Sequence, residues 1–211
     1  MATTELHSLS QPTTADVPED RPLLPYPHKR FTRTEYDRIC LTGVFEGQRV
    51  ELVEGEILRM SPIGSHHNVV VDLADERMKQ IFPRGYRVRV QSSFVVPIET
   101  ELEPDIAVVL GNARDYLTRN PDAAVLIIEV AESSREYDMT AKASLYARGD
   151  VLDYWVIDLT QPAIHVFRSP GPQTDSPFQY GYRDVRTYRP EEIVSPLAMP
   201  ESGILVSDLL P

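Results

Sequence analysis

The spacing of apolar residues changes from helical to alternating and back again along the first third of the chain. A capping-box sequence, Thr-Arg-Thr-Glu, begins at Thr32, and the apolar residues after it predict a short helix to about Leu41. Alternating positions on both sides of Gly55 then predict a β-hairpin. A second helical pattern over 65–82 predicts the longest helix, which Pro83 ends. The predicted apolar face of this helix consists of Val69, Val70, Leu73, Met78 and Ile81.

The middle of the chain is rich in β-forming residues. Segment 86–98 predicts strand structure with a break in register at Gln91–Ser93, and it leads into an acidic loop that ends at Pro104. Segments 105–110 and 123–130 are nearly continuous apolar runs. Such runs are typical of strands that are covered on both faces.

Helix and strand signals alternate again toward the C-terminus. A helix is predicted from an N-cap at Ser133 or Ser134 to Gly149, and strands are predicted at 153–158 and 163–168. Short β-like pieces after them predict an edge hairpin and a terminal segment that lies on the core. The order of elements predicts an α/β fold with a mixed β-sheet flanked by helices on both faces, together with an added N-terminal helix and hairpin.

Composition is ordinary for a folded protein. The chain has 211 residues, of which 42% are hydrophobic and 25% charged, so there is room for one sizeable core. Residues 1–28 contain five prolines and no apolar period, which predicts a flexible arm before a single domain at 29–211. No apolar run approaches the ~18 residues of a membrane span, and the first residues are polar and acidic. We therefore expect a cytoplasmic protein that does not engage a membrane.

Cysteine content and charge narrow the possible chemistry. Cys40 is the only cysteine, which excludes an intrachain disulfide and a zinc site built on several thiolates. A metal ion would need oxygen or imidazole ligands. The net charge of -11 has the wrong sign for binding nucleic acid over the whole surface. Segment 76–90 is locally basic, with five basic residues and one acid, and is either a solvated turn or a surface that contacts phosphate.

Two carboxylates stand in the apolar segments. Asp105 opens one predicted strand, and Glu129 stands near the end of the next. If these strands pair antiparallel, both carboxylates lie at one end of the sheet. Buried carboxylates are unfavourable unless they are paired or bind a cation, so their convergence favours a divalent metal site. Alternatively, Asp105 caps a turn and Glu129 pairs with a nearby arginine or lysine.

Other candidate residues surround this pair in the sequence. A third acid is available from Glu51, Glu54 or Glu56 in the hairpin, although all three could be solvated. His66 and His67 stand in the first turn of the long helix, where they could bind metal or phosphate or simply begin the helix. On the helix after Glu129, Lys142 forms an i,i+4 pair with Asp138, but its stem also follows an apolar stripe that could direct the ammonium group toward the carboxylates.

Several sequence blocks together resemble the Uma-type family of restriction endonucleases. They are VELVEGEI, MSPIGSHH, EPDIAVV, LIIEVAESS, YDMTAKASLYARG and DYWVIDL, in this order over roughly residues 30–168. The order and spacing of the blocks make the resemblance much more specific than any one block. The family belongs to the PD-(D/E)xK nuclease superfamily, so the resemblance implies a restriction-endonuclease-like core, here at 64–168.

The resemblance also implies roles for individual residues. Asp105 and Glu129 match the acids that hold Mg²⁺ or Mn²⁺ in that superfamily, with the main-chain carbonyl of Val130 as a further metal ligand. Ala131 occupies the usual place of the lysine, and Lys142 matches the helix lysine that substitutes for it in this family. The residues Glu51 and His67 match further catalytic positions, and Gln91 is a weaker candidate.

We therefore expect a Mg²⁺-dependent endonuclease that hydrolyses DNA. Two alternatives remain open at this stage: a catalytically silent binding or assembly module, favoured by the net acidity, and a metal hydrolase of small phosphorylated substrates, favoured by the lack of a continuous basic stripe. DNA is the expected partner. A homodimer through the apolar face of 153–158 and the β-rich tail would suit cleavage of both strands.

Overall fold

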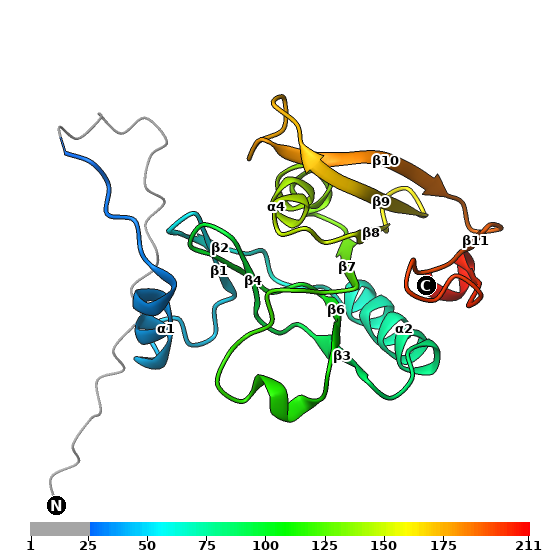
Figure 1. The fold of residues 1–211 in the computed structure, drawn as a ribbon, viewed down its shortest axis with the longest axis horizontal. Helices are drawn as coiled ribbons and strands as arrows, with labels where there is room; N and C mark the ends of the chain where they lie inside the picture. The colour runs from blue at the N-terminus through cyan, green and yellow to red at the C-terminus, as the bar shows by residue number, and fades with distance from the viewer. Residues whose placement is uncertain (1–25) are drawn as a thin grey trace, which may run out of the picture.

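The computed structural model describes residues 26–211, so nearly all of the predicted arm at 1–28 lies outside the described residues. Figure 1 shows the arrangement of the elements. Within this part of the chain, no helix is both long and apolar enough to cross a membrane. The helical elements are α1 (Arg33–Leu41), α2 (Ser65–Ile81), η1 (Ala113–Tyr116), α3 (Arg135–Tyr137), the π-helix η2 (Asp138–Lys142), α4 (Ala143–Arg148) and η3 (Val206–Leu209). The strands are β1 (Val50–Val53), β2 (Glu56–Arg59), β3 (Tyr86–Val90), β4 (Phe94–Val96), β5 (Thr100–Leu102), β6 (Ile106–Leu110), β7 (Leu126–Ala131), β8 (Asp153–Asp158), β9 (Ala163–Pro172), β10 (Tyr180–Tyr188), β11 (Ile193–Val194) and β12 (Ile204–Leu205).

A six-stranded mixed sheet forms the centre of the molecule. Its strand order is β10-β9-β8-β7-β6-β3, and β7 pairs parallel with β8 whereas the other neighbours are antiparallel. The β9–β10 hairpin forms one edge, as predicted. The helical connection between β7 and β8 is what allows two consecutive strands of the sheet to run in the same direction.

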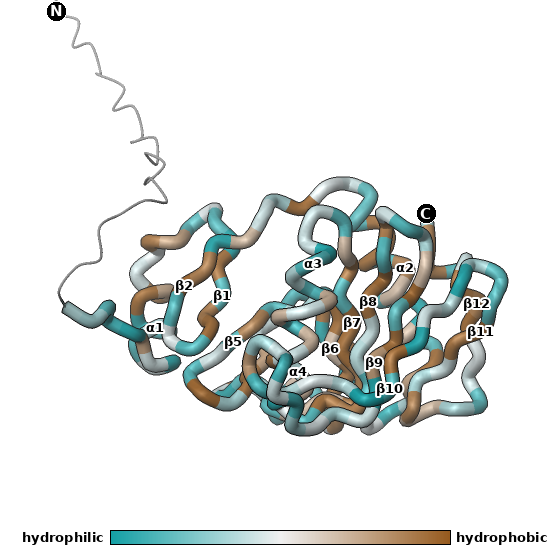
Figure 2. The backbone as a smooth tube through the Cα atoms, turned by 90° about the horizontal axis from the view of Figure 1, so that it is seen from above, coloured by the Kyte–Doolittle hydropathy of each residue, from teal (hydrophilic) through white to brown (hydrophobic). Residues whose placement is uncertain are grey.

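Alternating side chains of these strands build two cores on opposite faces of the sheet. On β7, Ile128 and the residues two positions before and after it pack against α2. Ile127 and Ala131 point to the opposite face and pack against α4. Figure 2 shows the central strands as the most hydrophobic stretch of the backbone. The predicted mixed sheet covered by helices on both faces is confirmed, and the continuous apolar runs of β6 and β7 are explained by this double coverage.

A smaller sheet, ordered β2-β1-β5-β4, lies beside α1. Thr32 and Glu35 form the predicted capping box of α1. The predicted acidic loop before Pro104 is wrong in part, because Thr100–Leu102 form the buried strand β5, which pairs with β1 and β4. The predicted break at Gln91–Ser93 is confirmed, since β3 and β4 belong to different sheets.

The apolar face of α2 differs from the predicted one. Val69 is 48% exposed, whereas Val71 and Ala74 are buried between the helix and the sheet. The buried face of α2 is therefore rotated relative to the predicted one. Near the C-terminus, Val206 and Leu209 of η3 join the same core, which agrees with the predicted terminal segment.

The predicted dimer surface on 153–158 is wrong. All six residues of β8 are buried, because β8 is paired with β7 and β9 and covered by both cores. This strand is therefore not available to a second chain. A dimer through other surfaces, and the division into an arm and one domain, stay predictions.

The turn of the β1–β2 hairpin supplies a test of this fold. Gly55 has a φ of 80°, and a Cβ there would lie 2.8 Å from Arg30 Cβ and 2.9 Å from Phe31 O. Gly47 has a similar φ of 74° but nothing within 4 Å of a Cβ. We expect Gly55→Ala to lower the free energy of unfolding by about 2 kcal/mol or more, and Gly47→Ala by no more than about 1 kcal/mol. Urea unfolding of both variants measures the difference, and equal losses would contradict the close packing of this turn.

Candidate active site

Asp105 and Glu129 meet at one end of the central sheet. The antiparallel register pairs Ile106 with Ile128, so the next residues along the two strands face each other. The backbone N–H of Val130 donates to Asp105 Oδ2 at 2.9 Å, and the N–H of Asp105 donates to Glu129 Oε2 at 3.4 Å. Each carboxylate residue is only 3% exposed. The predicted convergence of these two acids is confirmed.

Two side chains hold the Asp105 carboxylate from the side of α2 and β3. His67, in the first turn of α2, contacts Asp105 Oδ1 through Nε2 at 2.9 Å, and Gln91 Nε2 donates to the same oxygen at 3.2 Å. Burial alone would raise the pKa of Asp105, but the contact with His67 and the hydrogen bond from Val130 hold this pKa below its usual range. Asp105 is therefore ionised and fixed in orientation. Of the two adjacent histidines, only His67 contacts this carboxylate, and His66 is exposed.

Lys142 approaches Glu129 from the other face of the sheet. Its Nζ lies 2.9 Å from Glu129 Oε1, 3.1 Å from Glu51 Oε1 and 4.0 Å from Asp138 Oδ1. The lysine residue is 3% exposed. The predicted i,i+4 pair of Lys142 with Asp138 is therefore present at 4.0 Å. The ammonium group lies closer, however, to the carboxylates of Glu129 on β7 and Glu51 in the hairpin, as the alternative prediction expects.

The helix that carries Lys142 has a local irregularity at this point. Asp138–Lys142 form one π-helical turn between α3 and α4, and the hydroxyl of Tyr154 donates to the backbone carbonyl of Asp138 at 2.9 Å. Such single turns are frequent at functional sites. Ser134 occupies the predicted N-cap position, but its hydroxyl accepts no hydrogen bond from the helix backbone and instead donates to Asp138 Oδ2 at 2.5 Å.

Sequence analysis did not identify Tyr146 as part of the site. This fully buried tyrosine donates a hydrogen bond to Glu129 Oε1 at 2.7 Å. It follows Lys142 by four residues, so both side chains project from the same face of the helix. That spacing is the signal in the sequence that could have identified it.

The hairpin contributes one of its three acids to the site. Glu51 is 1% exposed; its Oε1 accepts from the backbone N–H of Glu103 at 3.0 Å, and its Oε2 has no hydrogen-bond partner in the described chain. Glu54 pairs with Arg148 at the surface of α4, and the exposed Glu56 pairs with Arg30. Of the three hairpin acids, only Glu51, which lies within the buried strand β1, therefore reaches the site.

Negative charge exceeds positive charge among the buried groups. Three carboxylates, from Glu51, Glu129 and Asp138, surround the single ammonium group of Lys142, which raises the pKa of the lysine well above its usual range. Burial raises the pKa of Glu129 to about 8 and that of Asp138 to about 6, and Lys142 opposes both shifts. An additional cation at this site would therefore be favourable.

A cavity of about 390 Å³ opens in front of the carboxylates. The hairpin and the segment that joins it to α2 form one wall, and the start of the helical segment after β7 forms the other. The residues that line it are Arg49, Leu58, Arg59, Met60, Ser61, Pro62, Ile63, Gly64, His67, Asp105, Glu129, Val130, Glu132, Ser133, Ser134, Tyr137, Asp138 and Lys142. The reactive groups thus lie at the base of a cavity and not on an open surface.

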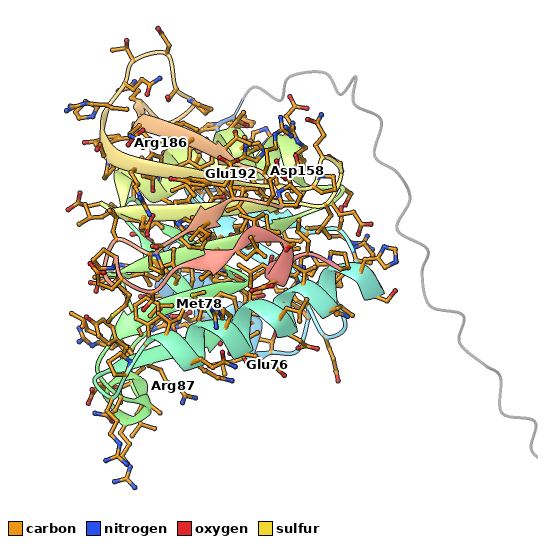
Figure 3. The ribbon with its side chains drawn as sticks, turned by 90° about the vertical axis from the view of Figure 1, so that its right-hand side faces the viewer. Glu76, Met78, Arg87, Asp158, Arg186 and Glu192 are labelled. Carbon is orange, nitrogen blue, oxygen red and sulfur yellow. The ribbon has the colours of Figure 1, made fainter. Side chains whose placement is uncertain are left out.

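None of the basic residues of segment 76–90 lines this cavity. α2 rises about 1.5 Å per residue, so its C-terminal end is roughly 20 Å from His67. Figure 3 shows Arg87 at the opposite end of the molecule from Asp158, which pairs with Ala131 near the site. Lys79 is bound to Asp75. The basic residues of this segment are therefore not part of the cavity, and the interpretation of the segment as a surface that contacts phosphate stays a prediction.

The donor groups fit an ion that prefers oxygen. Asp105 and Glu129 offer carboxylate oxygens, and Val130 lines the same cavity. Within residues 26–211 no group of three or more His, Cys, Asp or Glu side chains could hold a metal ion, so a closed all-protein site is not present. Mg²⁺ commonly binds through one or two carboxylates and completes its coordination with water and substrate phosphate oxygens. The two acids and the excess negative charge fit such a partly open site.

Comparisons with known proteins agree with this description. A model of the Uma2 family, described as "Putative restriction endonuclease", matches residues 33–207. The fold is similar to a crystal structure of a "putative nuclease belonging to DUF820" from Anabaena variabilis, with a TM-score of 0.65 and 15% identity over 85% of this chain and 97% of the other. No curated protein matches the chain. The restriction-endonuclease-like fold expected from the sequence is confirmed.

The role of Lys142 as the shared partner of buried acids can be tested by stability. Lys142→Met leaves Glu51, Glu129 and Asp138 without their cation, and we expect a loss of about 3 to 5 kcal/mol in the free energy of unfolding. Adding Glu129→Gln to this variant removes one uncompensated charge and restores part of the loss. Urea unfolding of both variants measures these effects, and a Lys142→Met protein as stable as wild type would contradict the assigned ion pairs.

Proposed function

Because the chain belongs to the Uma2 nuclease family, we propose that it is a Mg²⁺-dependent endonuclease that hydrolyses phosphodiester bonds in DNA. The observation that carries the proposal is the buried pair of Asp105 and Glu129 at one sheet end, with Lys142 2.9 Å from Glu129 at the base of a cavity. Asp105 and Glu129 occur in the order that the PD-(D/E)xK resemblance implies, and Lys142 stands at the helix position that substitutes for the usual lysine in this family.

Asp105, Glu129 and the carbonyl of Val130 are the proposed metal ligands. Mg²⁺ bound there would polarise a phosphodiester oxygen and lower the pKa of an attacking water. His67 and Gln91 hold Asp105 by hydrogen bonds to Oδ1, so they act as positioning residues. This support fixes the carboxylate before substrate binds.

Lys142 is the proposed partner of the reacting phosphate. Its ammonium group has three hydrogen-bond donors and lies at the cavity, where it can neutralise negative charge that develops on the phosphate. Glu51 and Tyr146 fix this arrangement from two sides, since Glu51 contacts the lysine and Tyr146 donates to Glu129. Ala131, at the usual lysine position, is fully buried beside α4.

A second candidate is hydrolysis of a small phosphorylated substrate. The cavity of about 390 Å³ lies within the size range of small-molecule sites, roughly 300 to 1,000 Å³. Phosphate release from nucleotides in the presence of Mg²⁺, with plasmid DNA left intact, would favour this candidate over the endonuclease.

Cleavage of supercoiled plasmid tests the proposed function. With Mg²⁺ or Mn²⁺, we expect Asp105→Asn and Glu129→Gln to lower the cleavage rate at least about 100-fold. Each substitution removes a proposed ligand of the metal ion that would stabilise the negative charge of the transition state. Glu136→Gln, which changes an exposed acid outside the cavity, serves as the matched control and should cleave like wild type.

Circular dichroism shows whether each of these variants is folded. Titration calorimetry with Mn²⁺ then separates the enzyme from a silent module, since binding that Asp105→Asn abolishes supports the metal site. Equal cleavage by all four proteins, or no cleavage by wild type, would overturn the endonuclease.

A further inference from the structure

The cavity contains two arginines to which the proposed chemistry assigns no role. Arg49 directly precedes β1 and Arg59 ends β2, so they come from the two arms of the same hairpin. Neither forms a salt bridge within residues 26–211, whereas the nearby Arg30 and Arg148 are paired with hairpin glutamates. Two cationic side chains without carboxylate partners therefore stand at the cavity wall.

The backbone fixes the positions from which both side chains start. Arg59 is the strand partner of Val50, and the N–H of Met60 donates to the carbonyl of Arg49 at 2.9 Å. The same hairpin places Glu51 3.1 Å from Lys142. The two arginines and the buried acid Glu51 thus belong to the same hairpin, and the contact of Glu51 with Lys142 links this hairpin to the rest of the site.

The surroundings of these arginines suit a phosphodiester backbone. A guanidinium group presents a planar fork of N–H donors that matches two phosphate oxygens. The acid Glu103 is near Arg49: burial raises the pKa of Glu103, and the charge of Arg49 opposes this rise. Arg49 and Glu103 nevertheless form no ion pair in the described part of the chain, so the guanidinium group is not neutralised by this acid. On the same wall, the apolar residues Met60, Pro62 and Ile63 can contact the sugar and base faces of a strand.

We propose that Arg49 and Arg59 bind the phosphates that flank the scissile phosphate, so that the substrate strand enters the site along the β1–β2 hairpin. This inference rests on the proposed nuclease function and deepens it by naming the binding surface. It also gives a chain with a net charge of -11 two cationic side chains, unpaired within the described residues, at the place where the strand would lie.

The far end of the molecule offers matched control residues. Arg84 and Arg87 are exposed and, like the hairpin arginines, have no ion-pair partner among the described residues. They differ from Arg49 and Arg59 in position, since they lie at the C-terminal end of α2 and the start of β3. Removing two charges there changes the net charge equally but leaves the cavity unaltered.

The experiment compares two double variants: the hairpin variant Arg49→Ala/Arg59→Ala and the control variant Arg84→Ala/Arg87→Ala. Both are measured in plasmid cleavage with Mg²⁺ and in binding of a labelled DNA oligonucleotide with Ca²⁺ in place of Mg²⁺. For the hairpin variant we expect KM and Kd to rise about ten-fold per arginine, with kcat changed less than about three-fold. The slope of log K against log salt should fall by about 1 per arginine. Arg49→Lys/Arg59→Lys should keep the salt slope and recover part of the affinity, because lysine retains the charge but not the fork.

The outcomes separate this inference from the proposed function. If wild type cleaves DNA and the hairpin variant binds and cleaves as wild type does, the inference is overturned and the nuclease stands. An equal or larger loss in Arg84→Ala/Arg87→Ala also overturns it. If wild-type protein neither binds nor cleaves DNA, the proposed function fails and the inference fails with it. Thermal unfolding of each variant confirms that the partly exposed substitutions leave the fold intact.

Discussion

The ammonium group of Lys142 compensates three carboxylates that reach it from three different elements. Glu51 comes from the hairpin, Glu129 from the central sheet and Asp138 from the π-helical turn, and all are nearly inaccessible to water. A buried charge without a partner is strongly unfavourable, so these elements must assemble around the lysine together. The position of the hairpin over the sheet end, and with it the shape of the cavity, follows from this constraint.

The central sheet makes such burial possible because its two faces differ in composition: one forms a fully apolar core, and the other contains the buried acid Glu129. On β7, residues that point to α2 are uniformly apolar and form a conventional core with Met78 and Trp155. The alternate residues point to α4, and Glu129 stands among them between Ile127 and Ala131. One acid in an otherwise apolar row is tolerated because Tyr146 and Lys142 both donate hydrogen bonds to it.

The distribution of charge, more than its total, determines what this acidic chain can bind. Other buried acids at the strand ends are fully paired: Asp153 accepts from Arg168 and Trp155, and Asp158 accepts from Arg135. At the cavity, by contrast, acids outnumber their partners while two arginines remain without any in the described chain. Excess negative charge beside unpaired positive charge is the arrangement expected where a cation and a phosphate bind together.

Local sequence patterns predict the order of elements, the capping box at Thr32, the break at Gln91–Ser93 and the two acids at the strand ends, because each depends on local spacing or on the pairing of one strand with its neighbour. Sequence patterns did not predict β5, which pairs with a strand on either side and whose one acid, Glu101, accepts from Asn120, nor the buried face of α2, which depends on the sheet beneath it.

Contacts between distant parts of the chain determine which hairpin acid faces inward, which tyrosine binds Glu129 and which arginines line the cavity. These features depend on contacts between residues far apart in the chain, such as Glu51 with Lys142. A basic run such as 76–90 is easily seen in a sequence, but none of its basic side chains lines the cavity, whereas a hairpin turn brings Arg49 and Arg59 together there.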